Sequence, residues 1–229
     1  MTDILWLPGT LCDHRLFAAQ REVFGEHTTA QVGQFDSVTM QAHAAWQQVE
    51  ASKVALVGLS YGGILALEMI RQHPERVSHL AILDSNARND TGEKQRERNA
   101  LVQRLFEGDF ENIVMDQLKP LYLAKANQDN LDILSTVRDM AMDQGEAVLT
   151  RQIKAVRGRP DQRPNLALIR VPTLIMAGTE DILCPEDRQR EMHESIPYSE
   201  LVLLQNCGHL ATLEQPERVN EALEQLFKR

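Results

Sequence analysis

The sequence predicts a doubly wound α/β fold, in which helices cover both faces of a mostly parallel sheet of about six strands. Three observations lead to this prediction. Short apolar segments bounded by turn residues recur along the chain and have the length of strands. These segments are apolar almost continuously rather than alternately, as in parallel strands buried on both faces. Segments with helical spacing lie between them, and alternation of strands and helices indicates an α/β architecture.

Five segments are predicted to be buried strands, and a sixth is a weaker candidate. Each is short and ends at turn residues. The weaker candidate is Thr28–Val32. The five stronger segments are Ile4–Leu7, Lys53–Leu59, His79–Asp84, Thr173–Ala177 and Leu201–Leu204.

Helical patterns fall between the strands and after the last one. Asp13 is placed to cap the first helix. The segment Ile64–Gln72 is apolar nearly all round and stops before Pro74, as expected of a buried helix. The predicted helices of the core are Leu16–Phe24, Thr39–Val49, Ile64–Gln72, Asp187–Ile196 and Pro216–Phe227.

The interval from residue 86 to residue 163 departs from this alternation. It holds no convincing strand, and the stretch from Arg157 to Pro164 is predicted to be the loop that returns to the sheet. We therefore expect a core made of residues 1–85 and 164–229, interrupted by a helical insertion at residues 86–163. The helices predicted within the insertion are Glu93–Phe106, Glu111–Leu123, Asn130–Met142 and Glu146–Val156.

Composition and charge indicate which classes of binding partner the protein is expected to lack. The formal net charge of -9 discourages binding to nucleic acid or to an anionic membrane surface. The first residues lack the basic flank and apolar stretch of a signal peptide, and no run approaches the roughly 20 apolar residues of a membrane span. Three cysteines in 229 residues do not resemble a disulfide framework. We expect a cytoplasmic protein, whose oligomeric state the sequence does not indicate.

A candidate nucleophile lies in the sequence Gly58-Leu59-Ser60-Tyr61-Gly62, which matches the pattern G-x-S-x-G. A predicted strand precedes it and a predicted helix follows. A sharp turn between strand and helix holds the serine in an unfavourable backbone conformation, so its neighbours must be small. Gly58 and Gly62 meet that need, and the turn lifts the Ser60 hydroxyl above the sheet edge. The alternative is an ordinary glycine-rich turn with a capping serine.

A serine hydroxyl becomes a strong nucleophile only when a base accepts its proton. His209 lies in a glycine-containing loop after the last strand, at the sheet edge where Ser60 is expected. His14, which follows the first strand, is the second candidate. For the remaining five histidines a surface role is the plainer interpretation.

The base needs a carboxylate that fixes its tautomer and stabilises its charged form. Asp181 follows the strand Thr173–Ala177 and is the first candidate. Asp84, at the end of the preceding strand, is the better alternative, and Glu180 is a further competitor. With Asp181 the order along the chain is serine, aspartate, histidine.

A tetrahedral intermediate also needs hydrogen-bond donors for its oxyanion. One should be the backbone N–H of Tyr61, directly after the nucleophile. The other should come from the loop after the first strand, where Gly9 permits a tight turn. The N–H of Thr10 is the first choice and that of Leu11 the second, although an ordinary Pro-Gly turn would look the same.

These motifs resemble the α/β-hydrolase family, in the small bacterial branch of carboxylesterases, lactonases, cofactor-free haloperoxidases and carbon–carbon bond hydrolases. The resemblance implies that the insertion is a lid over the active site. The family often has His-Gly where this chain has Pro8-Gly9, and the chain starts directly at the strand before that loop, so we expect the usual first hairpin to be missing. The segments that carry the resemblance are Leu7-Pro8-Gly9, Gly58 to Gly63, His73 to Val77, Val171 to Asp181, and Gly208-His209 before Glu214 to Glu217.

We therefore predict a serine hydrolase that cleaves a small ester-like substrate through an acyl-enzyme on Ser60 and that needs neither cofactor nor metal. Carbon–carbon bond hydrolysis or elimination by the same residues is the alternative, and a ligand-binding module without catalysis is a third hypothesis. Cys12, Cys184 and Cys207 follow strands, but their spacing matches no zinc pattern. The return-loop arginines Arg157, Arg159 and Arg163 could meet an acidic substrate group, and solvent exposure is their plainer interpretation.

Overall fold

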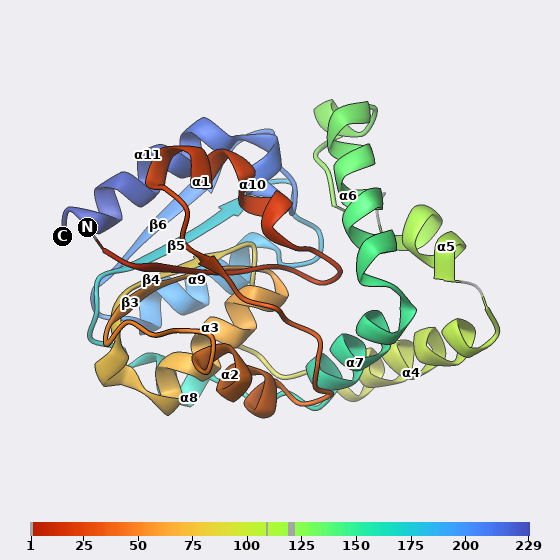
Figure 1. Ribbon diagram of the computed structural model, residues 1–229, viewed down its shortest axis with the longest axis horizontal. Helices are drawn as coiled ribbons and strands as arrows, with labels where there is room; N and C mark the ends of the chain where they lie inside the picture. The colour runs from red at the N-terminus through yellow and green to blue at the C-terminus, as the bar shows by residue number, and fades with distance from the viewer. Residues whose placement is uncertain (1, 109, 119–121) are drawn as a thin grey trace.

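The computed structural model describes residues 2–108, 110–118 and 122–229. They form one six-stranded sheet in the order β2-β1-β3-β4-β5-β6, with every neighbouring pair parallel (Figure 1). The predicted doubly wound fold is confirmed. The strands are β1 (Ile4–Leu7), β2 (Thr28–Thr29), β3 (Val54–Leu59), β4 (Val77–Leu83), β5 (Thr173–Gly178) and β6 (Ser199–Leu204).

The edge strand β2 is shorter than the predicted segment Thr28–Val32. Only Thr28 and Thr29 pair with β1. The Ala30 N–H still donates to the Trp6 carbonyl at 2.9 Å. Past Ala30 the chain leaves the sheet, and the side-chain oxygen of Gln41 accepts hydrogen bonds from the N–H groups of Gly33, Gln34 and Phe35. A side chain therefore replaces the neighbouring strand as the partner of these backbone groups.

Four further strands differ from the prediction by one or two residues at their ends. β3 begins at Val54 rather than Lys53, β4 begins at Val77 rather than His79, and β5 continues to Gly178 rather than Ala177. β4 stops at Leu83 rather than Asp84, because Asp84 takes a φ of 46°. β6 begins at Ser199 rather than Leu201, and its pairing with β5 extends to Ser199 and Glu200.

Helices cover both faces of the sheet (Figure 1). One face carries α2 (Val38–Trp46), α3 (Tyr61–Gln72), α8 (Arg163–Leu166) and α9 (Glu186–Ser195). The other carries η1 (His14–Phe17), α1 (Ala18–Phe24), α10 (Ala211–Glu214) and α11 (Pro216–Phe227), and the short η2 (Pro74–Arg76) leads into β4. Asp13 does act as a cap, but of the 3-10 turn η1, where its carboxylate accepts the Arg15 N–H. α8 and α10 were not predicted, since segments of four residues carry no periodic pattern.

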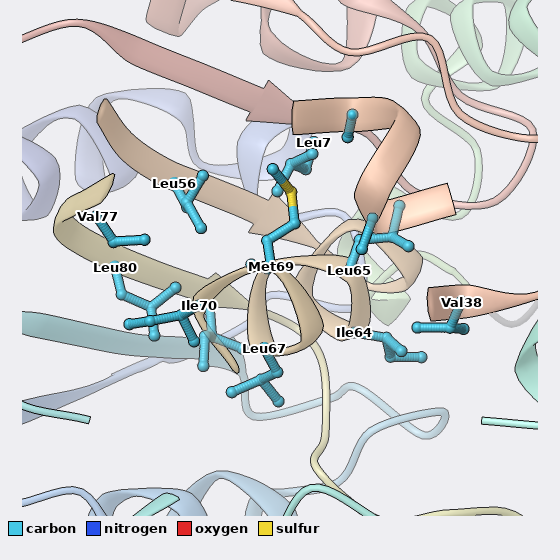
Figure 2. Packing of buried hydrophobic residues seen from close by; sticks show 14 of the residues in the cluster. Leu7, Val38, Leu56, Ile64, Leu65, Leu67, Met69, Ile70, Val77 and Leu80 are labelled. Atoms are coloured by element: carbon cyan, nitrogen blue, oxygen red, sulfur yellow. The ribbon is translucent and has the colours of Figure 1, made fainter. Parts of the chain in front are cut away.

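Helix α3 is buried on nearly every side, as its apolar sequence predicts. Leu65, Met69 and Ile70 lie in one cluster with Leu56 of β3 and Leu80 of β4 (Figure 2). Each fully buried side chain of this size contributes about 1.5–3 kcal/mol relative to an exposed one. This packing fixes the start of α3 against the end of β3, which is where Ser60 lies.

In the predicted insertion every described regular element is a helix, and these helices, joined by turns and loops, lie beside the sheet at the right in Figure 1. Leu105, Ile113, Ala141 and Leu149 form a separate apolar cluster that also takes in Leu11 of the core. No helix in residues 2–108, 110–118 and 122–229 has both the length and the apolarity needed to cross a membrane. The elements are α4 (Gly92–Phe106), α5 (Phe110–Asn112), the π-helix η3 (Ile113–Leu118), η5 (Lys125–Asn127), α6 (Leu131–Gln144) and α7 (Glu146–Arg157).

The single helix predicted at Glu111–Leu123 is wrong. The segment instead winds as one short α turn and then as a π-helix, and residues 119–121 lie outside the described part. In the π-helix Ile113 and Val114 are neighbours along the chain and both are buried. Tertiary packing in the insertion thus overrides the regular 3.6-residue pattern.

Candidate functional site

Ser60 lies in the strained turn that its sequence motif predicts. Its backbone has φ 55° and ψ −114°, in a region that non-glycine residues rarely adopt. The turn is held by a hydrogen bond from the Ser60 N–H to the Leu83 carbonyl, at 2.9 Å. A Cβ atom at Gly62 would overlap the Leu7 carbonyl oxygen, and one at Gly58 would overlap the backbone of Gly62. Both glycines are therefore required by close backbone approach.

Three residues far apart in the sequence are joined by two consecutive hydrogen bonds. With the His209 proton on Nδ1, the Ser60 hydroxyl donates to Nε2 of His209 at 2.8 Å. The Nδ1–H of His209 in turn donates to Oδ2 of Asp181, also at 2.8 Å. The side chains of His209 and Asp181 are 4% and 0% exposed, so water does not compete strongly for these bonds.

Asp181 is itself held in place by backbone donors. Its second oxygen, Oδ1, accepts hydrogen bonds from the N–H groups of Leu183 at 2.8 Å and Cys184 at 3.0 Å. Both carboxylate oxygens are thus engaged, and the one facing His209 has a fixed direction. The carboxylate can therefore orient the imidazole and stabilise its protonated form.

The other candidates for the acid and the base lie elsewhere. Asp84 accepts hydrogen bonds from the N–H groups of Gly178 at 3.0 Å and Ala211 at 3.3 Å. Burial, with the nearby charge of Asp181, raises the pKa of the Asp84 carboxyl well above its ordinary value. Glu180 accepts the Lys125 N–H, and the His14 side chain is 60% exposed beside Asp13. Among the described residues, Asp181 alone provides a carboxylate bond to His209.

The loop after β1 leaves one of its two candidate oxyanion donors free. A turn closed by the Cys12 N–H and the Gly9 carbonyl, at 3.1 Å, places Leu11 at φ 56°. The Leu11 N–H donates to the side-chain oxygen of Gln152 at 3.0 Å, which removes Leu11 as a candidate. Within the described ranges no acceptor is found for the N–H groups of Thr10 and Tyr61. Both residues line the cavity that contains Ser60.

That cavity has a volume of about 450 Å³ and lies between the core and the insertion. This volume suits a small ligand. One part of its wall is apolar, and the Tyr122 ring lies 5.8 Å from the His209 ring, measured between centroids. The apolar lining residues include Ile64, Leu101, Leu149, Ile153, Val156, Leu183 and Leu210.

Glu214 connects the histidine loop, which contains Gly208, His209 and Leu210, to the insertion. The sequence did not reveal this role. Its Oε1 accepts the Gly208 N–H at 2.9 Å and the Leu210 N–H at 3.3 Å. Its Oε2 accepts the Ala124 N–H at 2.8 Å and the Asn127 side-chain amide at 2.9 Å. One carboxylate therefore holds both neighbours of the base and the chain that passes over them.

We expect Glu214→Ala to destabilise the fold by about 3 kcal/mol, because four donors lose a charged acceptor. Hydrogen exchange at the amides of Gly208 and Leu210 should accelerate, as should exchange at Ala124. The control is Glu217→Ala, at an exposed position on the next helix. Equal exchange rates in the two variants would show that Glu214 does not hold this loop.

The three cysteines are free and buried. Asp181, Cys184 and His209 offer ligand atoms within 4.8 Å of one another, a spacing that could suit a metal ion. Both nitrogens of His209 and both oxygens of Asp181 already take part in hydrogen bonds. Burial raises the pKa of the Cys184 thiol to about 12, so the metal-binding thiolate is scarce near neutral pH. Asp181 and His209 therefore suit the hydrogen bonds that link Ser60, His209 and Asp181 better than they suit a metal centre.

The cysteines should resist alkylation in the folded protein. Burial raises the pKa of the Cys12 and Cys184 thiols to about 12, which leaves a thiolate fraction of only about 10⁻⁴ at pH 8. We expect iodoacetamide to modify no cysteine over an hour at pH 8 and all three in urea, as measured by intact mass. Rapid modification of the native chain would contradict the closed packing around these thiols.

Comparisons with known proteins agree with the observed fold. YisY of Bacillus subtilis (strain 168), described as an AB hydrolase superfamily protein, is 26% identical over 199 residues, which cover 83% of this chain and 72% of YisY. A malate-bound esterase from Thermogutta terrifontis shares the fold with a TM-score of 0.91 at 22% identity, covering 100% of this chain and 90% of that one.

A second solved structure is the enol-lactonase from Burkholderia xenovorans LB400, with a TM-score of 0.85 at 18% identity. The alignment covers 100% of this chain and 92% of the enol-lactonase. Most directly, the sequence model of the alpha/beta hydrolase family matches residues 10–222, nearly the whole chain. The protein therefore belongs to the α/β-hydrolase family.

Proposed function

We propose that the protein is a serine hydrolase that cleaves a small ester-like substrate, namely a carboxylic ester, a thioester or a lactone. The observation that carries this proposal is the chain of two 2.8 Å hydrogen bonds from Ser60 through His209 to Asp181. Such a chain turns a weakly nucleophilic hydroxyl into a strong nucleophile. The esterase and the enol-lactonase that share the fold make an acyl substrate the first class to test.

The proposed reaction has two halves. The Ser60 oxygen attacks the substrate carbonyl while Nε2 of His209 takes its proton, and the Tyr61 and Thr10 N–H groups stabilise the oxyanion. His209 then gives this proton to the leaving group as the old bond breaks, which leaves an acyl-enzyme. Water then attacks the acyl carbonyl while His209 takes its proton, and His209 returns this proton to the Ser60 oxygen as the acyl bond breaks, which releases the acid and the free serine. Asp181 orients the imidazole throughout.

The insertion at residues 86–163 is proposed to act as the lid of this site. Residues from α4 and α7 line the cavity together with Ser60 and His209. A cover of this kind keeps bulk water away from the reacting carbonyl and strengthens the electrostatic interactions inside. It would also select the substrate by shape.

A substrate panel tests the proposed function. Purified protein is incubated with p-nitrophenyl acyl esters, acyl thioesters, lactones and a carbon–carbon hydrolase substrate such as a vinylogous diketone. We expect turnover of at least one acyl class, and labelling of one residue by a fluorophosphonate. Turnover confined to the diketone would favour carbon–carbon cleavage by the same residues. Neither labelling nor turnover would favour a ligand-binding module and contradict the proposal.

Two aspartate variants separate the candidates for the acid. Asp181→Asn should lower kcat by about 10³- to 10⁴-fold, because an amide cannot stabilise the protonated imidazole. Asp84→Asn should lower kcat by less than about 10-fold, since Asp84 bonds backbone groups and not His209. Initial rates on the best ester of the panel provide the measurement. The reverse order of effects would assign the acid role to Asp84.

A further inference from the structure

The cavity at Ser60 has a cationic wall, although the chain carries a net charge of -9. Its charged lining residues are Arg88, Lys94, Arg98, Arg159 and Arg188 against Asp90 and Glu97. Three of the cations pair with carboxylates, although Asp187 also lies 3.8 Å from Arg88, and Glu191 lies 3.7 Å from Arg163, which has Asp161 as its nearer partner. Arg88 pairs with Glu191 at 2.7 Å, Lys94 with Glu97 at 2.9 Å, and Arg188 with Asp187 at 2.6 Å.

The two remaining arginines share a single buried carboxylate. Oδ1 of Asp90 lies 2.9 Å from Nη1 of Arg159, and Oδ2 of Asp90 lies 2.5 Å from Nε of Arg98. The side chains of Arg159 and Asp90 are 7% and 2% exposed. One carboxylate between two guanidinium groups leaves one positive charge uncompensated, and this charge is only partly hydrated, since the Arg98 side chain is 29% exposed. Burial accordingly lowers the pKa of Arg159.

Both arginines also have N–H groups that bind no acceptor in the described part of the chain. Nε of Arg159 donates to the Arg88 carbonyl at 2.7 Å, and Nη1 donates to the Val156 carbonyl at 3.2 Å besides its ion pair with Asp90. For Nη2 of Arg159, and for both amino groups of Arg98, the described part of the chain provides no acceptor. Planar N–H groups of this kind match the two oxygens of a carboxylate.

We infer that the substrate carries a free carboxylate, bound by Arg159 and Arg98, in addition to the acyl bond presented to Ser60. This inference rests on the proposed function of Ser60 and specifies its substrate class. One uncompensated positive charge matches a monoanion, and a cavity of about 450 Å³ can hold a small acid ester but leaves little space for a large anion. The substrate is thus a half-ester of a dicarboxylic acid, or a lactone or ester with an acidic side chain.

The other two return-loop arginines do not share this position. Arg157 donates to Asn99 on the exposed surface at 2.5 Å, and Arg163 pairs with Asp161 at 2.6 Å. Neither lines the cavity. Arg157 therefore offers a matched control, since it lies two residues from Arg159 and carries the same charge.

The test compares charged and neutral esters of equal length. The first pair is p-nitrophenyl hydrogen adipate and p-nitrophenyl methyl adipate, and a second pair carries the carboxylate, or its amide, on the leaving alcohol. The wild-type chain should prefer the charged member of at least one pair by roughly 10-fold or more in kcat/KM. Arg159→Met should abolish that preference through a raised KM, Arg159→Lys should keep part of it, and Arg157→Met should match the wild type. An unchanged preference in Arg159→Met, or none in the wild type, would overturn the inference.

A binding measurement separates this inference from the proposed chemistry. Calorimetry with monomethyl adipate uses Ser60→Ala, alone and combined with Arg159→Met, and melting curves confirm that both variants fold. Binding should weaken roughly 10-fold or more when Arg159 is replaced. Equal binding by the two variants overturns the carboxylate site, even if esters are hydrolysed. If Ser60→Ala retains hydrolysis while binding still depends on Arg159, the carboxylate site stands and the role of Ser60 fails.

Discussion

Ser60→Ala should lower kcat for ester hydrolysis by about 10⁴- to 10⁶-fold. The methyl group cannot attack the carbonyl, and the hydrogen bond from position 60 to His209 is lost. KM should change little, because the cavity walls and the oxyanion donors remain. Steady-state and single-turnover rates on the best ester of the panel provide the measurement.

The control for this variant is Ser135→Ala, which removes the hydroxyl of an exposed serine in helix α6 that bonds only its own helix. It should keep wild-type kcat, and circular dichroism should show that both variants fold. Residual turnover within about 10-fold of the wild type in Ser60→Ala would remove Ser60 from the mechanism.

Gly62→Ala should have the largest effect on stability, at about 4 kcal/mol or more. The added Cβ would overlap the carbonyl oxygen of Leu7, the last residue of β1. A backbone atom, unlike a flexible side chain, cannot relieve this overlap by a change of rotamer. Strand β1 and helix α3 would have to separate, which would open the core beneath Ser60. Urea unfolding followed by circular dichroism gives the free energy, and loss of a cooperative transition is the extreme form of the expected result.

Gly158→Ala provides the matched control for the same chemical change. A Cβ there meets its nearest atom, the Lys154 carbonyl oxygen, at 3.6 Å, an ordinary contact. Its stability should stay within about 1 kcal/mol of the wild type. If Gly62→Ala is as stable as Gly158→Ala, the close approach of the turn to β1 is not real.

The sequence predicted the parts of this molecule that depend on local patterns. Continuous apolar runs marked the strands, and the carboxyl ends of β3, β5 and β6 then located Ser60, Asp181 and His209 near one another. This works because parallel strands end at one edge of the sheet, so loops distant in sequence gather there. The preference for Asp181 over Asp84 agrees with the observed bond to His209.

The features that sequence reasoning missed depend on tertiary contacts. Gln152 caps the Leu11 N–H from a helix 141 residues away, and Glu214 bonds both the histidine loop and the insertion. A polar residue on a helix gives no sign that it will be buried against a distant backbone donor. The prediction for the insertion failed for the same reason, since its packing produced a π-helix where the spacing of apolar residues predicted a regular α-helix.

The most direct test is to locate the covalent adduct formed with a fluorophosphonate by peptide mass spectrometry. The account predicts a single modification per chain, on the peptide that contains Ser60, with much slower labelling in His209→Ala. A modified residue elsewhere, or continued ester turnover by a chain that never becomes labelled, would contradict the claim that Ser60 is the nucleophile.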